Sequence, residues 1–320
     1  MNNVDVQFAD IRGGRLGFRD LGNPDGRPVL FLHGSGPGVT GWRNYSESVG
    51  AFADEFRCIV LEFPGFGISD VRGGHPVVDA RNSCVEILDH LGIGRASIVG
   101  NSMGGIVGAG LAAKQPDRVD RLVCIGGVGT TLFSPGPAEG IRLLMDFLAE
   151  PDKPALRRWL RSMVYDQTLV TEQLLEERWA QVNEPGVIES MKSLYNPAAI
   201  AKVARGEVSF DLADVTAPTL LFWGRDDRVS PVDMSIMPMR LMPDSEVHIL
   251  PNCGHWVMIE QKDASSGRRG SSCCGADLAM RRAGQPGASA VAAPVIVFAQ
   301  TRAFDSFSPF GLQRRSGRPG

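Results

Sequence analysis

The stretch Ala96-Ser-Ile-Val-Gly-Asn-Ser-Met-Gly-Gly105 decides the fold of this chain of 320 residues. It begins as a short apolar run, turns at a Gly-x-Ser-x-Gly sequence around Ser102, and continues into an Ala- and Gly-rich segment with helical spacing over Met103–Gln115. Glycines permit the tight strand-to-helix turn that lifts a serine hydroxyl above the edge of a sheet. The helix start adds free N–H groups and positive potential. The pattern therefore predicts Ser102 as a nucleophile.

Short apolar runs recur along the chain and alternate with amphipathic segments such as Val77–Leu91. Continuous runs of Val, Ile, Leu and Phe are typical of strands buried on both faces of a parallel sheet. These runs are Val29–Leu32, Cys58–Leu61, Ala96–Val99, Leu122–Ile125, Thr219–Trp223 and Val247–Leu250. Before them, Val4–Ile11 and Leu16–Asp20 alternate around two glycines and indicate a hairpin. The sequence thus predicts an α/β fold with a mostly parallel central sheet flanked by helices.

The strand pattern stops between about Thr130 and Asp211, where amphipathic segments follow one another without a strand-like run. We expect an inserted helical cap at 131–211, between core parts at 1–130 and 212–264. A separate helical domain is less favoured, because the sheet pattern resumes directly at Thr219. Residues 265–320 hold no lysine and are rich in Gly and Arg. We expect most of this tail to be disordered, although Val291–Ala299 could form a strand.

The composition of the chain indicates which classes of binding partner to expect. The chain is 43% hydrophobic and 22% charged with a net charge of −3, which gives no reason to expect nucleic acid or an anionic membrane. No apolar run could cross a bilayer, and the first residues do not resemble a secretory signal. Four of the six cysteines are scattered singly, and the adjacent Cys273 and Cys274 have no matching pair for zinc. We expect a cytoplasmic protein, as a monomer or a homo-oligomer.

A second glycine-rich turn, His33-Gly-Ser-Gly-Pro-Gly38, follows the strand-like run Val29–Leu32. A flexible turn there can direct the backbone N–H of Ser35 at a developing oxyanion, together with the N–H of Met103. It could also be a plain glycine-rich turn. A phosphate loop fits poorly because no Gly-Lys-Ser/Thr follows.

Two further loops complete a constellation. Asp226 and Asp227 follow the run ending at Trp223, and either carboxylate could accept from a histidine. His255 follows the next run, in Asn252-Cys-Gly-His-Trp256, and a lone loop histidine is more often structural than catalytic. The order Ser, Asp, His, each after a predicted strand, is that of the α/β-hydrolase fold. The combination predicts a serine hydrolase with His255 as base, whereas His75, His90 and His248 have no such context.

With these residues in hand, the chain resembles the meta-cleavage product hydrolases, the carbon–carbon bond hydrolases of bacterial aromatic and steroid ring degradation. The resemblance spans about 6–264 and rests on four stretches and on the cap segment around Glu177-Arg-Trp179. The stretches are His33-Gly-Ser-Gly-Pro-Gly-Val-Thr-Gly-Trp-Arg-Asn44, Gly100-Asn-Ser-Met-Gly-Gly105, Trp223-Gly-Arg-Asp-Asp-Arg228 and Cys253-Gly-His-Trp256. The resemblance implies that Asp227 is the acid of a Ser102–His255–Asp227 triad.

The resemblance also implies a substrate site. Arg178 would bind the substrate's carboxylate with its planar guanidinium. Asn44 and Asn101 would hydrogen-bond the dienoate end, Trp256 would form a wall of the pocket, and Gly36 would contact the substrate. From the residues alone, the favoured interpretation of Arg178 is a solvated helix position beside Glu176 and Glu177.

The implied substrate is a 2-hydroxy-6-oxo-hexa-2,4-dienoate with a variable group at its ketone end. Ser102 would attack the C6 ketone, His255 would handle proton transfers, and no metal or organic cofactor is required. A carboxylesterase or thioesterase with the same triad is the enzymatic alternative, distinguished by whether Arg178 faces Ser102. An inactive hydrolase-fold protein is the other alternative, because the amphipathic helix that ends the family's chains cannot be read after Ala264.

Overall fold

The structure, a computed structural model, describes residues 4–11, 13–196 and 210–261. The expectations for the tail at 265–320, including Val291–Ala299, lie outside the described residues.

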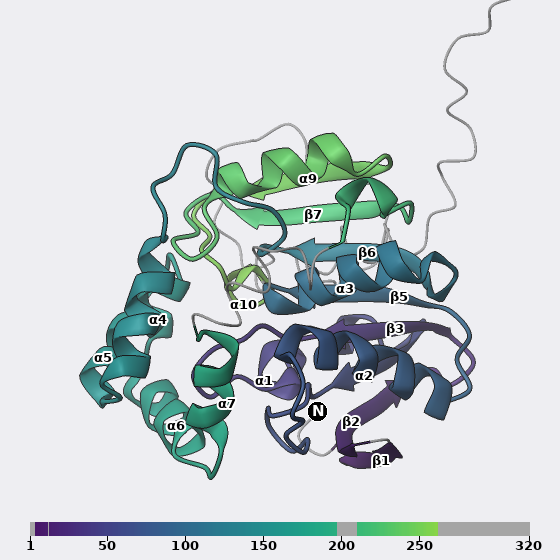
Figure 1. Cartoon of the computed structure of the whole chain (residues 1–320), viewed down its shortest axis with the longest axis horizontal. Helices are drawn as coiled ribbons and strands as arrows, with labels where there is room; N and C mark the ends of the chain where they lie inside the picture. Colours follow the sequence, from purple (N-terminus) through teal and green to yellow (C-terminus); the bar gives the residue numbers. More distant parts are fainter. Residues whose placement is uncertain (1–3, 12, 197–209, 262–320) are drawn as a thin grey trace, which may run out of the picture.

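One sheet organises the described part of the chain, with the strand order β1-β2-β4-β3-β5-β6-β7-β8 (Figure 1). Its strands are β1 (Gln7–Ile11), β2 (Gly14–Gly22), β3 (Arg27–Leu32), β4 (Phe56–Leu61), β5 (Ala96–Asn101), β6 (Val119–Ile125), β7 (Thr219–Gly224) and β8 (Ser245–Leu250). The β1–β2 and β2–β4 pairs are antiparallel, and every later pair is parallel. The predicted hairpin and mostly parallel sheet are therefore confirmed.

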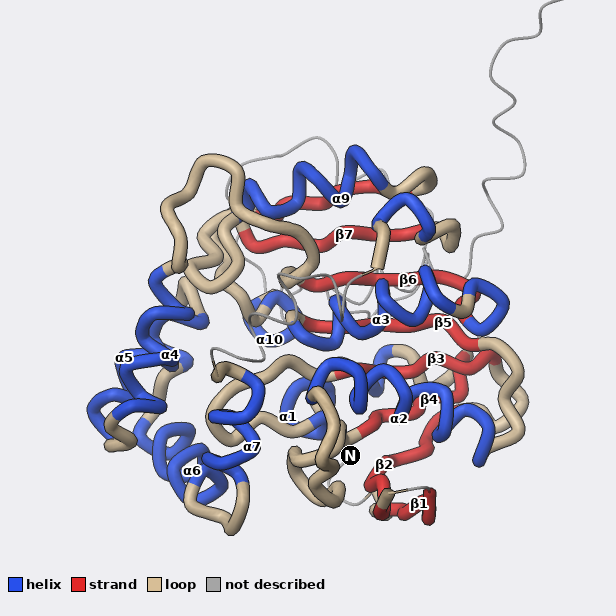
Figure 2. Tube along the Cα trace, in the orientation of Figure 1, coloured by secondary structure: helices blue, strands red, loops and turns tan. Residues whose placement is uncertain are grey.

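The helices fall into two groups. Those of the core are α1 (Gly41–Tyr45), α2 (Pro76–His90), α3 (Met103–Lys114), α9 (Ile236–Leu241) and α10 (Val257–Glu260). Between β6 and β7 lie α4 (Glu139–Ala149), α5 (Lys153–Met163), α6 (Glu172–Val182) and α7 (Val187–Leu194). Short 3-10 turns lie at Val49–Ala51, Pro116–Arg118, Gln167–Leu169, Leu212–Asp214 and η5 (Val232–Ser235). Figure 2 shows α4 to α7 gathered beyond one end of the strands.

Side chains that accept the first free N–H groups begin two helices of this inserted group, α5 and α6. Asp152 accepts from the N–H of Ala155 at the start of α5, and Thr171 accepts from Leu174 at the start of α6. No helix among the described residues is long and apolar enough to cross a membrane.

The sheet separates two hydrophobic clusters. On one side Leu30 and Ile98 pack with apolar residues of α2 and α3. On the other side Phe31 and Val123 belong to a cluster that continues into the inserted helices, where it includes Trp159. Because burial of apolar surface is the main favourable term in folding, a shared cluster joins these helices to the sheet as one body.

Asp233 in η5 holds the loop that leads from β6 into α4. Its Oδ2 accepts the N–H groups of Leu132, Phe133 and Ser134 at 2.8, 2.7 and 3.0 Å, and its Oδ1 accepts the Ser134 hydroxyl at 2.9 Å. Burial alone would raise the pKa of Asp233, but these four donors together lower it well below its ordinary value. The ionised carboxylate is thus the form that the fold favours.

We expect Asp233→Asn to lower the free energy of unfolding by about 1.5–3 kcal/mol at pH 7, because the charged acceptor is lost. A carboxyl whose pKa is lowered by folding stabilises the protein above its unfolded pKa of about 3.9, and that contribution fades as the pH falls below it. Denaturant unfolding of both proteins at pH 7 and at pH 3 measures the difference between their free energies of unfolding. This difference should be smaller at pH 3. Asp146→Asn, at an exposed site on α4, is the matched control. A difference of the same size at both pH values would contradict the assignment.

Candidate active site

Ser102 stands at a sharp turn between β5 and α3, with a positive φ of 53° and ψ of −114°. Neighbouring glycines make this turn possible. A Cβ at Gly100 would lie 2.3 Å from the carbonyl oxygen of Gly104, and one at Gly104 would lie 2.2 Å from that of Leu32. Since real Cβ atoms do not approach so closely, any side chain at either position would push α3 away from the sheet. The predicted nucleophile turn is present at Ser102.

His255 and Asp227 form a buried pair, with 2.7 Å between His255 Nδ1 and Asp227 Oδ2. The other oxygen of Asp227, Oδ1, accepts the N–H groups of Val229 and Ser230, both at 2.8 Å. Asp226 instead directs its carboxylate at Arg225 on the surface. An ionised carboxylate can only accept, so Nδ1 carries the proton and Nε2 keeps its lone pair for a hydroxyl.

The His255 loop is held by residues 161–166, which form the last turn of α5 and the stretch just after it. The carbonyl of Met163 accepts the N–H groups of His255 and Trp256, at 2.8 and 3.3 Å. Arg228, the residue after Asp227, also donates to this segment, at the carbonyls of Arg161 and Val164. Both the Asp227 loop and the His255 loop are therefore attached to one segment.

Glu260 in α10 adds a second attachment between the same parts. Its Oε1 accepts the N–H of Gly254 at 2.6 Å, and its Oε2 accepts those of Tyr165 and Asp166 at 2.7 and 3.0 Å. Burial raises the pKa of Glu260, and the three N–H groups oppose that rise. The loop beside His255 thus has defined support within the described residues.

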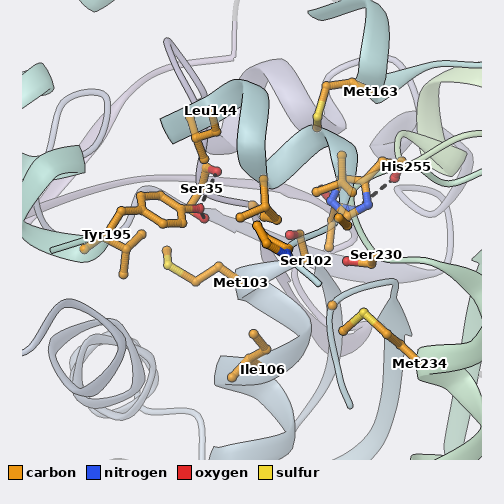
Figure 3. A pocket seen from close by; sticks show the side chains of 18 of the residues that line it. Ser35, Ser102, Met103, Ile106, Leu144, Met163, Tyr195, Ser230, Met234 and His255 are labelled. Carbon is orange, nitrogen blue, oxygen red and sulfur yellow. Dashed lines mark hydrogen bonds between the residues drawn. The ribbon is translucent and has the colours of Figure 1, made fainter. Parts of the chain in front are cut away.

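A cavity of about 410 Å³ opens above Ser102 (Figure 3). Seven of the predicted site residues line it: Ser35, Asn44, Asn101, Ser102, Met103, His255 and Trp256. Met103 is the first residue of α3, where a backbone N–H has no partner within the helix. The cavity therefore brings together the predicted nucleophile, the predicted base and the expected oxyanion turn.

Two amides at the cavity wall have an orientation set by their partners. Asn101 donates from Nδ2 to the carbonyls of Ile125 and His255, at 3.0 and 3.4 Å, which leaves its Oδ1 to accept from Asn44 Nδ2 at 3.3 Å. Asn44 Oδ1 then has no partner among the described residues. A buried acceptor in this state favours a ligand that donates a hydrogen bond, such as an enol hydroxyl.

Arg178 and Gly36 are not among the residues that line this cavity. A Cβ on Gly36 would meet the ring of Trp159 at 2.5 Å. Arg178 lines a neighbouring cavity, and its guanidinium lies over the ring of Trp256, 5.1 Å from the centroid. Trp256 borders both cavities, so Arg178 stands directly behind the wall of the Ser102 cavity.

The structure adds residues that the motifs did not reveal. Tyr195, just after α7, shares a 2.7 Å hydrogen bond with the Ser35 hydroxyl and donates to the Ser35 carbonyl at 3.2 Å (Figure 3). His75, for which the sequence indicated no role, accepts from the N–H of Val77 at the start of α2 and borders the cavity. No sequence motif surrounds Tyr195, but the position of His75 before Pro76 is a recognisable helix start.

Comparison with known proteins agrees with this geometry. The family model described as alpha/beta hydrolase fold matches residues 27–262. A 2-hydroxy-6-oxo-6-phenylhexa-2,4-dienoate hydrolase of Burkholderia cepacia is 38% identical over 270 residues, covering 82% of this chain and 92% of that protein. A 2-hydroxy-6-oxononadienedioate/2-hydroxy-6-oxononatrienedioate hydrolase of Comamonas testosteroni matches with the same identity and the same coverage.

Solved structures show the same relationship. A meta-cleavage product hydrolase from Pseudomonas fluorescens IP01 superposes with a TM-score of 0.73 at 30% identity, covering 81% of this chain and 94% of that one. The 2-hydroxy-6-oxo-6-phenylhexa-2,4-dienoate hydrolase of Rhodococcus sp. strain RHA1 gives a TM-score of 0.73 at 26% identity, covering 82% and 96%. The chain belongs to the alpha/beta hydrolase fold family and, within it, to the meta-cleavage product hydrolases.

Proposed function

We propose that the chain hydrolyses a carbon–carbon bond in a 2-hydroxy-6-oxo-hexa-2,4-dienoate from aromatic ring fission. One observation carries this choice over ordinary ester hydrolysis: Arg178, a buried cation with no carboxylate partner among the described residues, lies beside a serine hydrolase site. A simple ester offers nothing for such a group to bind, whereas the dienoate offers a carboxylate.

The surroundings of Arg178 support a role in anion binding. The side chain is 2% exposed, its Nη1 makes only a long 3.4 Å hydrogen bond to the Pro37 carbonyl, and its Nε has no partner. The adjacent Glu177 pairs with Arg43 instead, at 2.7 Å. The pKa of Arg178 is lowered to about 9, chiefly by burial and also by Arg43, while Glu177 partly opposes the change. Because an unpaired buried charge is costly, Arg178 favours an incoming carboxylate beside Trp256, the residue that borders both cavities.

The triad would act on the ketone of this substrate. Ketonisation of the dienol first places a proton on the carbon beside the C6 ketone. His255 takes the Ser102 proton as Oγ attacks C6, and Asp227 holds the imidazole and stabilises its charged form. The Ser35 and Met103 N–H groups hold the tetrahedral oxyanion, contributing about 3 kcal/mol each. Breakage of the carbon–carbon bond sends the electron pair into the 2-oxo acid end, and water then releases the carboxylic acid from Ser102.

The proposal includes domain boundaries and a cellular compartment for the protein. We assign core parts at 1–130 and 212–264 and a cap at 131–211, which includes α4 to α7 between β6 and β7. We place the protein in the cytoplasm, because Cys58, Cys84, Cys124 and Cys253 are buried free thiols. Its partner is a small-molecule dienoate.

We expect Ser102→Ala to abolish turnover of a yellow dienoate ring-fission product, followed as loss of its visible absorbance, because the proposed mechanism begins with attack of the Ser102 hydroxyl on C6. The fall in kcat should exceed about 1000-fold. Wild-type protein that cleaves nitrophenyl esters but no dienoate would instead identify an esterase. Folded wild-type protein without turnover of either substrate would identify an inactive member of the family.

We expect Arg178→Gln to raise KM for the dienoate by about 10- to 100-fold, since a charge-assisted hydrogen bond is lost. Hydrolysis of nitrophenyl acetate, which has no carboxylate, should change little. Arg178→Lys is the matched control, because it keeps the charge but not the planar pair of donors. Equal losses with both substrates would show that Arg178 supports the fold only.

We expect Glu260→Gln to lower kcat about 10-fold with both substrates and to leave KM for the dienoate nearly unchanged, because the Gly254 and Tyr165 N–H groups lose part of their charged acceptor. Steady-state kinetics, with thermal unfolding in parallel, measure the effect. Glu176→Gln, at an exposed site on α6, is the control. An unchanged kcat would mean that the bonds to Met163 alone position His255.

A further inference from the structure

We infer that the group at the ketone end of the substrate is an uncharged hydrocarbon, such as a phenyl ring, and that a substituent ending in a carboxylate is rejected. This inference rests on the proposed function. Sequence similarity does not make the choice, because relatives named for a phenyl-substituted dienoate and for a nonadienedioate are both 38% identical to the chain. The second name denotes a substrate with two carboxylates.

The direction of the substrate follows from the polar groups around Ser102. Under the proposed function, the dienoate end would lie against Asn44, whose Oδ1 has no partner among the described residues, and toward Trp256, with Arg178 behind it. Since Ser102 attacks C6, the substituent on C6 must occupy the remaining part of the cavity.

That remaining part is built from apolar side chains of both layers. From the cap, α4 contributes Ile141 and Leu144, and α5 contributes Met163; from the core come Val229 and Met234. Figure 3 shows Met163 and Met234 on the same side of Ser102 as His255 and Ser230, with Leu144 above Ser35. The surface that faces the substituent is thus mainly hydrocarbon and thioether.

The polar residues of this cavity are poorly suited to replace a counter-ion. Among them, His75 accepts the N–H of Val77 through Nδ1, and a protonated ring would lose that bond. The hydroxyls that line it belong to Ser35, Thr130, Thr131, Ser230 and Tyr195, besides the nucleophile. No Lys, Arg, Asp or Glu is among the described residues lining the cavity. A carboxylate transferred there would lose its hydration without gaining a cation, whereas a phenyl ring would gain from leaving water.

The test compares two substrates on the full-length protein: 2-hydroxy-6-oxo-6-phenylhexa-2,4-dienoate and 2-hydroxy-6-oxononadienedioate. We expect kcat/KM for the phenyl compound to be higher by about 100-fold, given the penalty for burying an unpaired charge. Comparable or higher kcat/KM for the diacid would overturn the inference and leave the proposed carbon–carbon hydrolysis standing. Turnover of neither compound would overturn the proposed hydrolysis itself and the inference with it.

A charge placed in the apolar part tests the position of the substituent. Met234 is half-buried in η5, and lysine has a similar length. We expect Met234→Lys to raise kcat/KM for the diacid relative to the phenyl compound by at least about 10-fold, one favourable ion pair. Met234→Gln, polar but uncharged, should keep the wild-type order of the two substrates. An unchanged ratio in a folded Met234→Lys protein would show that the substituent does not lie against Met234, and would overturn the assignment of this part of the cavity.

Discussion

The close approach of backbone to backbone around Ser102 is the constraint on which the rest of the site depends. Gly100, Gly104 and Gly127 each bring a Cα to a place where a Cβ would collide with a main-chain atom. Gly127, after β6, would contact the Ser102 carbonyl at 2.5 Å. Three chain segments thereby meet at the nucleophile, and the positive φ of Ser102 is maintained by its surroundings. A loose turn here would misplace the hydroxyl, the Met103 N–H and the start of α3 together.

The inserted helices do more than cover this turn. Their apolar residues share one hydrophobic cluster with a face of the sheet, and their main chain bonds to both triad loops. Asp227 and His255 are set in place partly by residues far from them in sequence, because the contacts made by Arg228 and Glu260 end at 161–166. The inserted helices and the sheet therefore form a single framework, in which neither part alone defines the position of His255.

Much of this could be predicted from sequence where a local pattern has one physical cause. Strands buried on both faces produce continuous apolar runs, and a strained turn before a helix requires its glycines. Both the sheet and the turn at Ser102 could therefore be predicted from the sequence. The choice between Asp226 and Asp227 was not a matter of local chemistry, because it depends on the N–H groups of Val229 and Ser230 and on the reach of His255. The roles of Tyr195 and Glu260 likewise arise only from tertiary contacts.

Arg178 shows how a signal can be present and still be ambiguous. It lies on the same face of α6 as Leu175 and Val182, at a spacing that indicates burial, and those three are the buried residues of that helix. The charged neighbours Glu176 and Glu177 indicated a solvated position instead. Periodicity could place the guanidinium inside the protein, but its location behind Trp256 required the fold.

Met163 joins two properties that enzymes often separate. Its side chain lines the cavity, and its carbonyl oxygen holds the main chain of His255. A substrate that displaces the Met163 side chain would therefore also displace the carbonyl that bonds the main chain of His255. Selection for a different substituent at this position would alter the rate of proton transfer as well as the fit, so changes in specificity and in turnover would be inherited together through one residue.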